Sequence, residues 1–77
     1  GDVAIEWTLP RATPVRLALF DATGRLVVTL AEGFLPAGRH EARWNGLGAR
    51  GPAPAGVYFV ALDTPALRLT RRLVRLN

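Results

Sequence analysis

A chain of 77 residues has room for one small hydrophobic core, and with 49% hydrophobic residues it is too apolar for a disordered segment. It contains no Cys, which excludes a disulfide-stabilised scaffold and a cysteine-ligated zinc site. The longest apolar run, residues 57–62, is too short to span a bilayer as a helix. Ten basic residues, all of them Arg, against six acidic ones give a net charge of +4, so anionic partners have to be weighed.

The first half of the chain alternates between apolar and polar residues with the period of a β-strand. Residues 3–9 follow this pattern, and residues 15–20 and 25–30 follow it on either side of the turn formed by residues 21–24. The two runs that flank the turn predict a β-hairpin. Phe34 and Leu35 lie between Gly and Pro breakers and are expected to fill a gap in the core.

The second half continues the pattern. Residues 39–44 alternate, and residues 45–56 form the longest expected loop because they contain four Gly and two Pro. Residues 56–62 are apolar on both faces, which is typical of a central strand covered on both sides. Residues 67–76 form the last strand, in which the apolar positions change parity, so we expect a β-bulge at Arg71–Arg72.

The spacing of the turns indicates the architecture. Turn signals recur at intervals of about 8 to 12 residues, which is typical of a β-sandwich or barrel. No segment has the apolar stripe and the capping residues of an amphipathic helix. The residues therefore predict one all-β domain.

A set of motif residues is spread over this pattern, from the first turn to the penultimate strand. The set is Asp21, Gly24, Arg25, Gly38, Trp44, Asn45, Gly46, Gly56 and Tyr58. With these residues, and with Thr70–Val74 near the end, the chain resembles the immunoglobulin-like domain of the flagellar hook-capping protein FlgD. It is equally similar to the related C-terminal sorting domains of proteins exported by type IX secretion. The resemblance extends from about Ile5 to Leu76.

The resemblance implies a single domain over residues 1–77, an immunoglobulin-like antiparallel β-sandwich of about six or seven strands. It also implies that the chain is the C-terminal part of a larger protein. An Asn-Pro-Phe segment that usually precedes the first strand is missing, which leaves open whether that strand is present. If it is absent, a neighbouring edge is unpaired, and we expect it to pair with another copy or with an upstream domain.

Each motif residue also has a structural explanation that does not depend on the family. Glycines at chain reversals supply positive φ or a close backbone approach. Trp44 is large enough to seal one end of a sandwich while its indole N–H reaches a backbone oxygen. Asp21 and Asn45 can bond the backbone of their own turns. We therefore interpret these residues as parts of the scaffold.

Catalytic, metal and phosphate sites are poorly supported. With one His, His40, and no Ser or Cys, the chain cannot assemble a Ser–His–Asp triad or use a thiol nucleophile. Asp21 or Asn45 could hold a calcium ion, but turn capping explains both residues. The Gly46–Gly51 loop contains G-x-G but lacks the helix and the Lys of a phosphate loop. The sequence therefore predicts no enzyme, no cofactor and no metal.

Two binding classes remain alternatives. Arg68, Arg71, Arg72 and Arg75 could neutralise phosphates, but strand alternation divides them between two faces, and nucleic-acid binding is disfavoured. An accessory carbohydrate- or protein-binding module would need an exposed aromatic platform. Trp7 and Trp44 both fall on faces assigned to the core.

The resemblance therefore implies a non-enzymatic sorting or surface-attachment domain of a protein secreted by the type IX system. Its partner would be a protein of the secretion machinery or the upstream domain of the same chain, with an edge-strand homodimer as a further option. The location implied is extracytoplasmic, secreted or at the cell surface. The alternative is a structural domain of the flagellar hook cap, with an assembly protein as partner. The strand implied to be recognised during export consists of Arg72, Leu73, Val74, Arg75 and Leu76.

Overall fold

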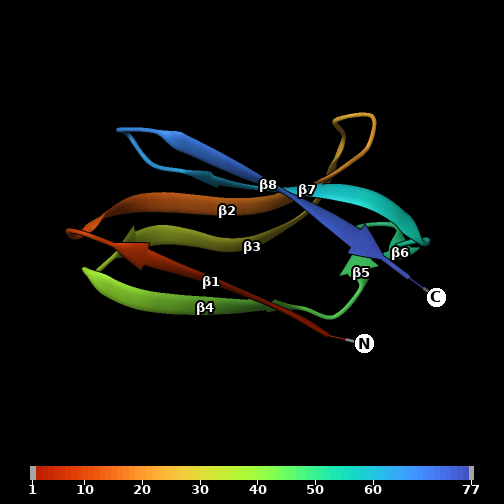
Figure 1. The fold of residues 1–77 in the computed structure, drawn as a ribbon, viewed down its shortest axis with the longest axis horizontal. Coiled ribbons are helices and arrows are strands. Elements are labelled where there is room, and N and C mark those ends of the chain that lie inside the picture. The colour runs from red at the N-terminus through yellow and green to blue at the C-terminus, as the bar shows by residue number, and fades with distance from the viewer. Residues whose placement is uncertain (1, 77) are drawn as a thin grey trace.

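The computed structural model describes residues 2–76, and this part of the chain contains β-strands and their connections without a helix (Figure 1). The strands are β1 (Val3–Leu9), β2 (Thr13–Asp21), β3 (Leu26–Leu35), β4 (Gly38–Trp44), β5 (Leu47–Gly48), β6 (Gly51–Pro52), β7 (Gly56–Asp63) and β8 (Arg68–Arg75).

The strands form two layers. The larger sheet has four strands in the order β3-β2-β7-β8, the smaller sheet pairs β1 with β4, and β5 and β6 form a short hairpin. All pairings are antiparallel. Figure 1 shows β1 and β4 lying against one face of the larger sheet. The predicted all-β fold is confirmed, and its six longer strands agree with an immunoglobulin-like sandwich.

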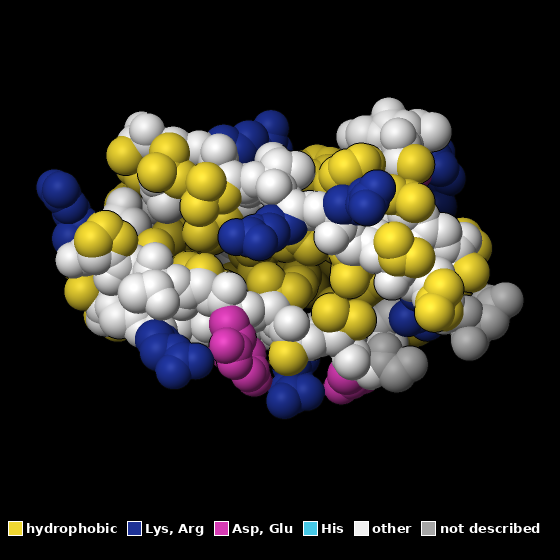
Figure 2. Space-filling view, in the orientation of Figure 1, with side chains coloured by type: hydrophobic (Ala, Val, Ile, Leu, Met, Phe, Trp, Pro, Cys, Tyr) yellow, Lys and Arg dark blue, Asp and Glu magenta, His cyan; other side chains and the backbone are white. Residues whose placement is uncertain are grey.

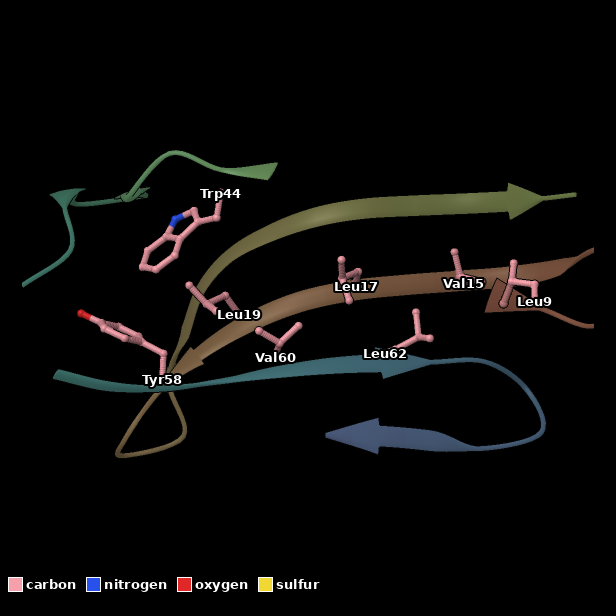
Figure 3. Close-up of a cluster of buried hydrophobic side chains, with 8 residues drawn as sticks. All are labelled: Leu9, Val15, Leu17, Leu19, Trp44, Tyr58, Val60 and Leu62. Atoms are coloured by element: carbon pink, nitrogen blue, oxygen red, sulfur yellow. The ribbon is translucent and has the colours of Figure 1, made fainter. Parts of the chain in front are cut away.

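The core lies between the layers and follows the alternation of the two central strands. Every second residue of β2 and of β7 points toward the smaller sheet, because side chains on a strand alternate between its faces. Figure 3 shows the resulting rows, with Trp44 and Tyr58 at one end and Leu9 and Val15 at the other. Leu19 and Trp44 are 0% and 1% exposed. The cluster consists of Leu9, Val15, Leu17, Leu19, Trp44, Tyr58, Val60 and Leu62.

The predicted hairpin is confirmed as β2–β3, but both strands are longer than the pattern indicated. β3 runs through Gly33, which pairs with Val15, and ends only at Leu35. Leu35 packs against the core as expected, whereas Phe34 is 70% exposed. The expectation that Phe34 fills the core is wrong, because the strand continues and its alternation directs Phe34 to the opposite face from Leu35.

The predicted bulge at Arg71–Arg72 is also wrong. β8 pairs with β7 in one unbroken register from Asp63↔Arg68 to Gly56↔Arg75. The change of parity is tolerated because β8 is an edge strand, on which apolar side chains such as Val74 stay exposed. The irregularities in pairing lie between β2 and β3 instead.

Two further expectations need adjustment. The stretch 45–56, expected to be an open loop, contains the hairpin β5–β6. The central position of β7 is confirmed, since it lies between β2 and β8. The expectation that β7 is covered on both faces is wrong, because Val57 on its outer face is 39% exposed. The second layer covers only the inner face of the larger sheet.

Candidate functional site

The turn between β2 and β3 is held by the carboxylate of Asp21. Its Oδ1 accepts hydrogen bonds from the Thr23 hydroxyl at 2.6 Å, from the Thr23 backbone N–H at 2.9 Å and from the Arg25 backbone N–H at 3.0 Å. The Thr23 hydroxyl, followed by the Arg25 N–H, lowers the pKa of Asp21 from 3.8 to about 2. The Oδ2 atom lies 3.4 Å from Nε of Arg25. Both carboxylate oxygens of Asp21 therefore accept hydrogen bonds from residues of the turn and stabilise it, as a capping side chain does.

Trp44 closes the end of the core nearest to this turn. Its indole Nε1 donates a hydrogen bond to the carbonyl of Leu47 at 2.9 Å. Its ring meets the ring of Tyr58 edge-on, with 5.4 Å between centroids, and the Tyr58 hydroxyl donates to the carbonyl of Pro54 at 2.5 Å. Each aromatic residue thus buries its ring and satisfies its polar atom. This confirms the expectation that Trp44 seals one end of the sandwich.

Arg75 of β8 completes the end cluster and was not predicted to do so. Its guanidinium carbon lies 5.3 Å from the centre of the Trp44 ring, and its Nε donates to the carbonyl of Ala53 at 3.0 Å. Gly46 leaves the space for this side chain, because a Cβ there would lie 2.5 Å from Nη2 of Arg75. Asn45 accepts a hydrogen bond from the Leu47 N–H at 3.0 Å. Alternation placed Arg75 on the same face of its strand as Arg71, but it did not show that this face is the inner one.

The structure brings most of the motif residues to this end of the molecule. Asp21 is the register partner of Tyr58, so the β2–β3 turn lies next to the Trp44 cluster. A pocket of about 220 Å³ separates the turn from the hairpin β5–β6. Gly56, the first residue of β7, pairs with Arg75 at the same end. Gly38 lies apart from the rest, because it starts β4 opposite Leu9 at the far end.

The predicted recognition strand, residues 72–76, consists of the second half of β8 and Leu76. In residues 2–76, β8 pairs only with β7, so its other edge is free. Leu73 faces inward and packs on the core, whereas Val74 and Leu76 are 54% and 80% exposed. This strand therefore presents both backbone groups and apolar side chains to a partner.

The arginines of β8 divide between the two faces, as the alternation predicts. Arg68 and Arg72 lie on the outer face, where Arg68 pairs with Asp63 at 3.0 Å and lies 5.6 Å from the ring centre of Phe20. Arg71 and Arg75 lie on the inner face. The division prevents the four side chains from forming a single phosphate-binding row on one face of the sheet.

The remaining polar candidates are held within the scaffold. His40 stacks on Trp7, its register partner, at 5.6 Å, and its Nε2 donates to the carbonyl of Pro36 at 2.7 Å. The loop that contains G-x-G folds into β5–β6. Within residues 2–76, no three or more His, Asp or Glu side chains gather closely enough to hold a metal ion. The described part of the chain has no helix that could cross a membrane.

One feature that the sequence reasoning missed is a groove between β1 and β8, lined by Trp7 and by Arg71 and Arg72 among others. It could not be found by pattern, because strands at opposite ends of the chain form its walls and periodicity does not show which strands become edges.

Comparisons with known proteins place the fold in a family. The family described as FlgD Ig-like domain matches residues 1–65, which contain β1 to β7 and the whole motif set but not β8. The resemblance of Thr70–Val74 to a family strand therefore stays a prediction. Searches of curated proteins and of solved structures gave no match. The family consists of non-catalytic structural modules found in extracytoplasmic proteins. The chain belongs to the FlgD Ig-like domain family.

Proposed function

We propose that this domain is a non-enzymatic C-terminal sorting and surface-attachment domain of a bacterial protein secreted by the type IX system. The observation that carries the proposal is the exposure of β8 as an edge strand, with Val74 and Leu76 54% and 80% exposed beside its free backbone. Large exposed apolar side chains next to a free edge are typical of a surface that is covered by a partner.

Recognition would operate by backbone pairing. A strand or extended loop of the export machinery adds to the free edge of β8, and the exposed apolar side chains give the contact its register. The mode needs no reactive side chain, which agrees with the use of Asp21, Asn45 and His40 as hydrogen-bonding groups of the scaffold.

A reporter fused to the N-terminus of this chain tests the proposal in a bacterium with a type IX system. We expect the reporter at the cell surface or in the medium, and in the periplasm of a matched strain without the system. Val74→Asp and Leu76→Asp should reduce the exported fraction by about tenfold, because they place charges on the contact. Leu26→Asp is the matched control, since Leu26 is 50% exposed on β3, the opposite edge of the same sheet. Retention of the unchanged fusion in the periplasm of the competent strain contradicts the proposal.

The second candidate is a structural immunoglobulin-like domain of the flagellar hook cap. It is favoured by the family match, which covers residues 1–65 and does not require β8. Replacing the corresponding domain of a hook-capping protein with this chain distinguishes the two roles. Restored hook assembly together with periplasmic retention of the reporter supports the flagellar role.

An accessory carbohydrate- or protein-binding module has less support. The aromatic platform that it requires would need Trp7 and Trp44 side by side at the surface. Trp44 is 1% exposed, and its indole N–H is used by the carbonyl of Leu47.

A further inference from the structure

A groove of about 540 Å³ runs between β1 and β8, the edge strands of the two layers. Core side chains, namely Leu17, Val60 and Leu62, form its floor, and the consecutive residues 3–8 of β1 form one wall. Figure 2 shows this hollow near the middle of the molecule, with hydrophobic side chains at its bottom and basic side chains above it. The groove therefore reaches the edge of the core, although Leu17, Val60 and Leu62 are only 2%, 8% and 7% exposed.

Both walls of the groove carry free backbone groups. Within the described residues, β1 is hydrogen-bonded to β4 alone and β8 to β7 alone. A strand that enters between them can pair with such an edge, and every second side chain of that strand then points to the apolar floor. The groove thus has the chemistry to accept an extended segment with an apolar face.

The charge at the groove restricts what that segment can be. Five acidic side chains form ion pairs with five arginines, namely Arg16–Glu32, Arg25–Asp21, Arg39–Glu6, Arg43–Glu41 and Arg68–Asp63. Arg71 and Arg72 line the groove and have no ion-pair partner in residues 2–76. Glu6, the acidic residue in the groove wall, is engaged with Arg39 of β4 at 3.3 Å. Arg71 therefore places one unmatched positive charge beside the apolar floor, and Arg72 places a second on the outer face of the same edge strand.

Arg71 has the more demanding position of the two. It is the register partner of the core residue Val60, and it lies on the inner face of β8 between Leu69 and Leu73. A positive charge between two apolar side chains of an edge strand opposes the approach of an uncharged or basic strand. A net negative charge on an incoming strand turns the same charge into an attraction.

Trp7 carries a polar atom that the described residues leave without a hydrogen bond. Its indole Nε1 is shielded from solvent and has no hydrogen-bond partner among the described residues. Other atoms of Trp7 line the groove. A buried indole N–H normally finds an acceptor, and leaving it without one is unfavourable.

A second copy of this chain fits the groove less well than an acidic segment. Each copy carries a net charge of +4, and β8 itself contains four arginines. Pairing β8 with β8 of another copy would place arginines on both strands of one ladder, where facing like charges are destabilising. The charge thus favours a partner of opposite sign.

We propose that the groove between β1 and β8 binds an extended peptide segment in which apolar and acidic side chains alternate. The apolar side chains pack on Leu17, Val60 and Leu62, and the acidic ones lie on the outer face, where they pair with Arg72. Arg71, on the inner face, adds to the positive charge that attracts the segment. The inference does not rest on the export role proposed above, because it concerns binding by the isolated chain. Failure of the reporter in cells leaves it standing, and its own failure leaves the export role standing.

Titration of the 77-residue chain with synthetic peptides of eight residues, the length of β8, tests the proposal. The peptides alternate valine with glutamate, alternate valine with lysine, or contain glutamate alone. Tryptophan fluorescence reports binding because Trp7 lies in the groove, and a Trp7→Phe variant identifies its contribution. We expect the valine–glutamate peptide to bind about tenfold or more tightly than either of the others.

A pair of charge-reversed variants provides the matched control. Arg71→Glu with Arg72→Glu should weaken binding of the valine–glutamate peptide by about tenfold or more and favour the valine–lysine peptide. Arg11→Glu with Arg50→Glu changes the net charge equally at exposed sites outside the groove and should leave binding unchanged. Near-UV circular dichroism checks the fold, and Arg71→Gln with Arg72→Gln replaces the reversed pair if that pair unfolds.

Several outcomes overturn the proposal. The first is that the valine–glutamate peptide does not bind. The second is that the valine–lysine peptide binds as tightly as the valine–glutamate peptide. The third is that the peptide of glutamate alone binds as tightly, which would mean that charge holds the ligand without the apolar floor. Sedimentation that shows a dimer which the peptide does not dissociate assigns the groove to a second copy instead.

Discussion

Gly24 and Gly46 have almost the same backbone conformation, with φ of 87° and 86°, but very different surroundings. A Cβ at Gly24 would meet no described atom within 4 Å, whereas at Gly46 it would lie 2.5 Å from Nη2 of Arg75. At this scale, one hydrogen atom in place of a methyl group decides whether Arg75 can lie on Trp44. The pair of glycines separates the effect of backbone conformation from the effect of space.

Gly46→Ala should destabilise the domain more than Gly24→Ala. Both place an L side chain in the left-handed region, at about 1–2 kcal/mol. Only the Gly46 variant also displaces Arg75 from Trp44 and Ala53, which adds roughly 1 kcal/mol. Urea unfolding measures both free energies. With Arg75→Ala in the background, the two variants should become equally unstable, and a difference that persists there would contradict the explanation.

Asp21 should make stability depend on acid pH. Its pKa is lowered from 3.8 to about 2 in the folded chain, so the unfolded chain binds more protons between these values. The stabilisation is complete above about pH 4 and is lost as the pH falls toward 2. Thr23→Val removes the strongest hydrogen-bond donor, so NMR titration should show the pKa of Asp21 rising toward 3.8 and the loss of Tm on acidification should become smaller. An unchanged pKa in Thr23→Val would show that the hydroxyl is not the cause.

At the scale of elements, position in the sheet decides what a leucine contributes. β2 lies between β3 and β7, and its Leu19 is fully buried. β3 forms an edge of the same sheet, and its first residue, Leu26, is 50% exposed. Leu26 pairs with Phe20, the neighbour of Leu19 that points to the opposite face, so the edge position and the outer face together expose it.

Leu19→Ala should reduce the free energy of unfolding by about 2–5 kcal/mol, because it leaves a cavity between the layers. The free energy of unfolding of a domain of this length is roughly 4–12 kcal/mol, so the variant loses a large share of its stability. Leu26→Ala is the matched control and should change the value by less than about 1 kcal/mol. The denaturant midpoints measure both. Equal effects would mean that the core does not lie between the two sheets.

At the scale of the whole molecule, the two layers are unequal. Four strands on one side face two on the other, and the molecule measures 37 × 23 × 19 Å. The smaller layer cannot cover the inner face of the larger one as far as β8, so the core remains accessible from the groove. The proposed peptide site follows from this inequality together with the unmatched charges of Arg71 and Arg72.

The sequence by itself determined the class of the fold, the β2–β3 hairpin, the turn chemistry of Asp21 and the sealing role of Trp44. These features depend on side-chain alternation and on contacts within a few residues, which a linear pattern contains. Tertiary structure alone decided the exposure of Phe34, the regular register of β8, the contact of Arg75 with Trp44 and the open groove. Each of these depends on which distant strands pair and which face receives a second layer, and a period of two assigns residues to two faces without showing which face is covered.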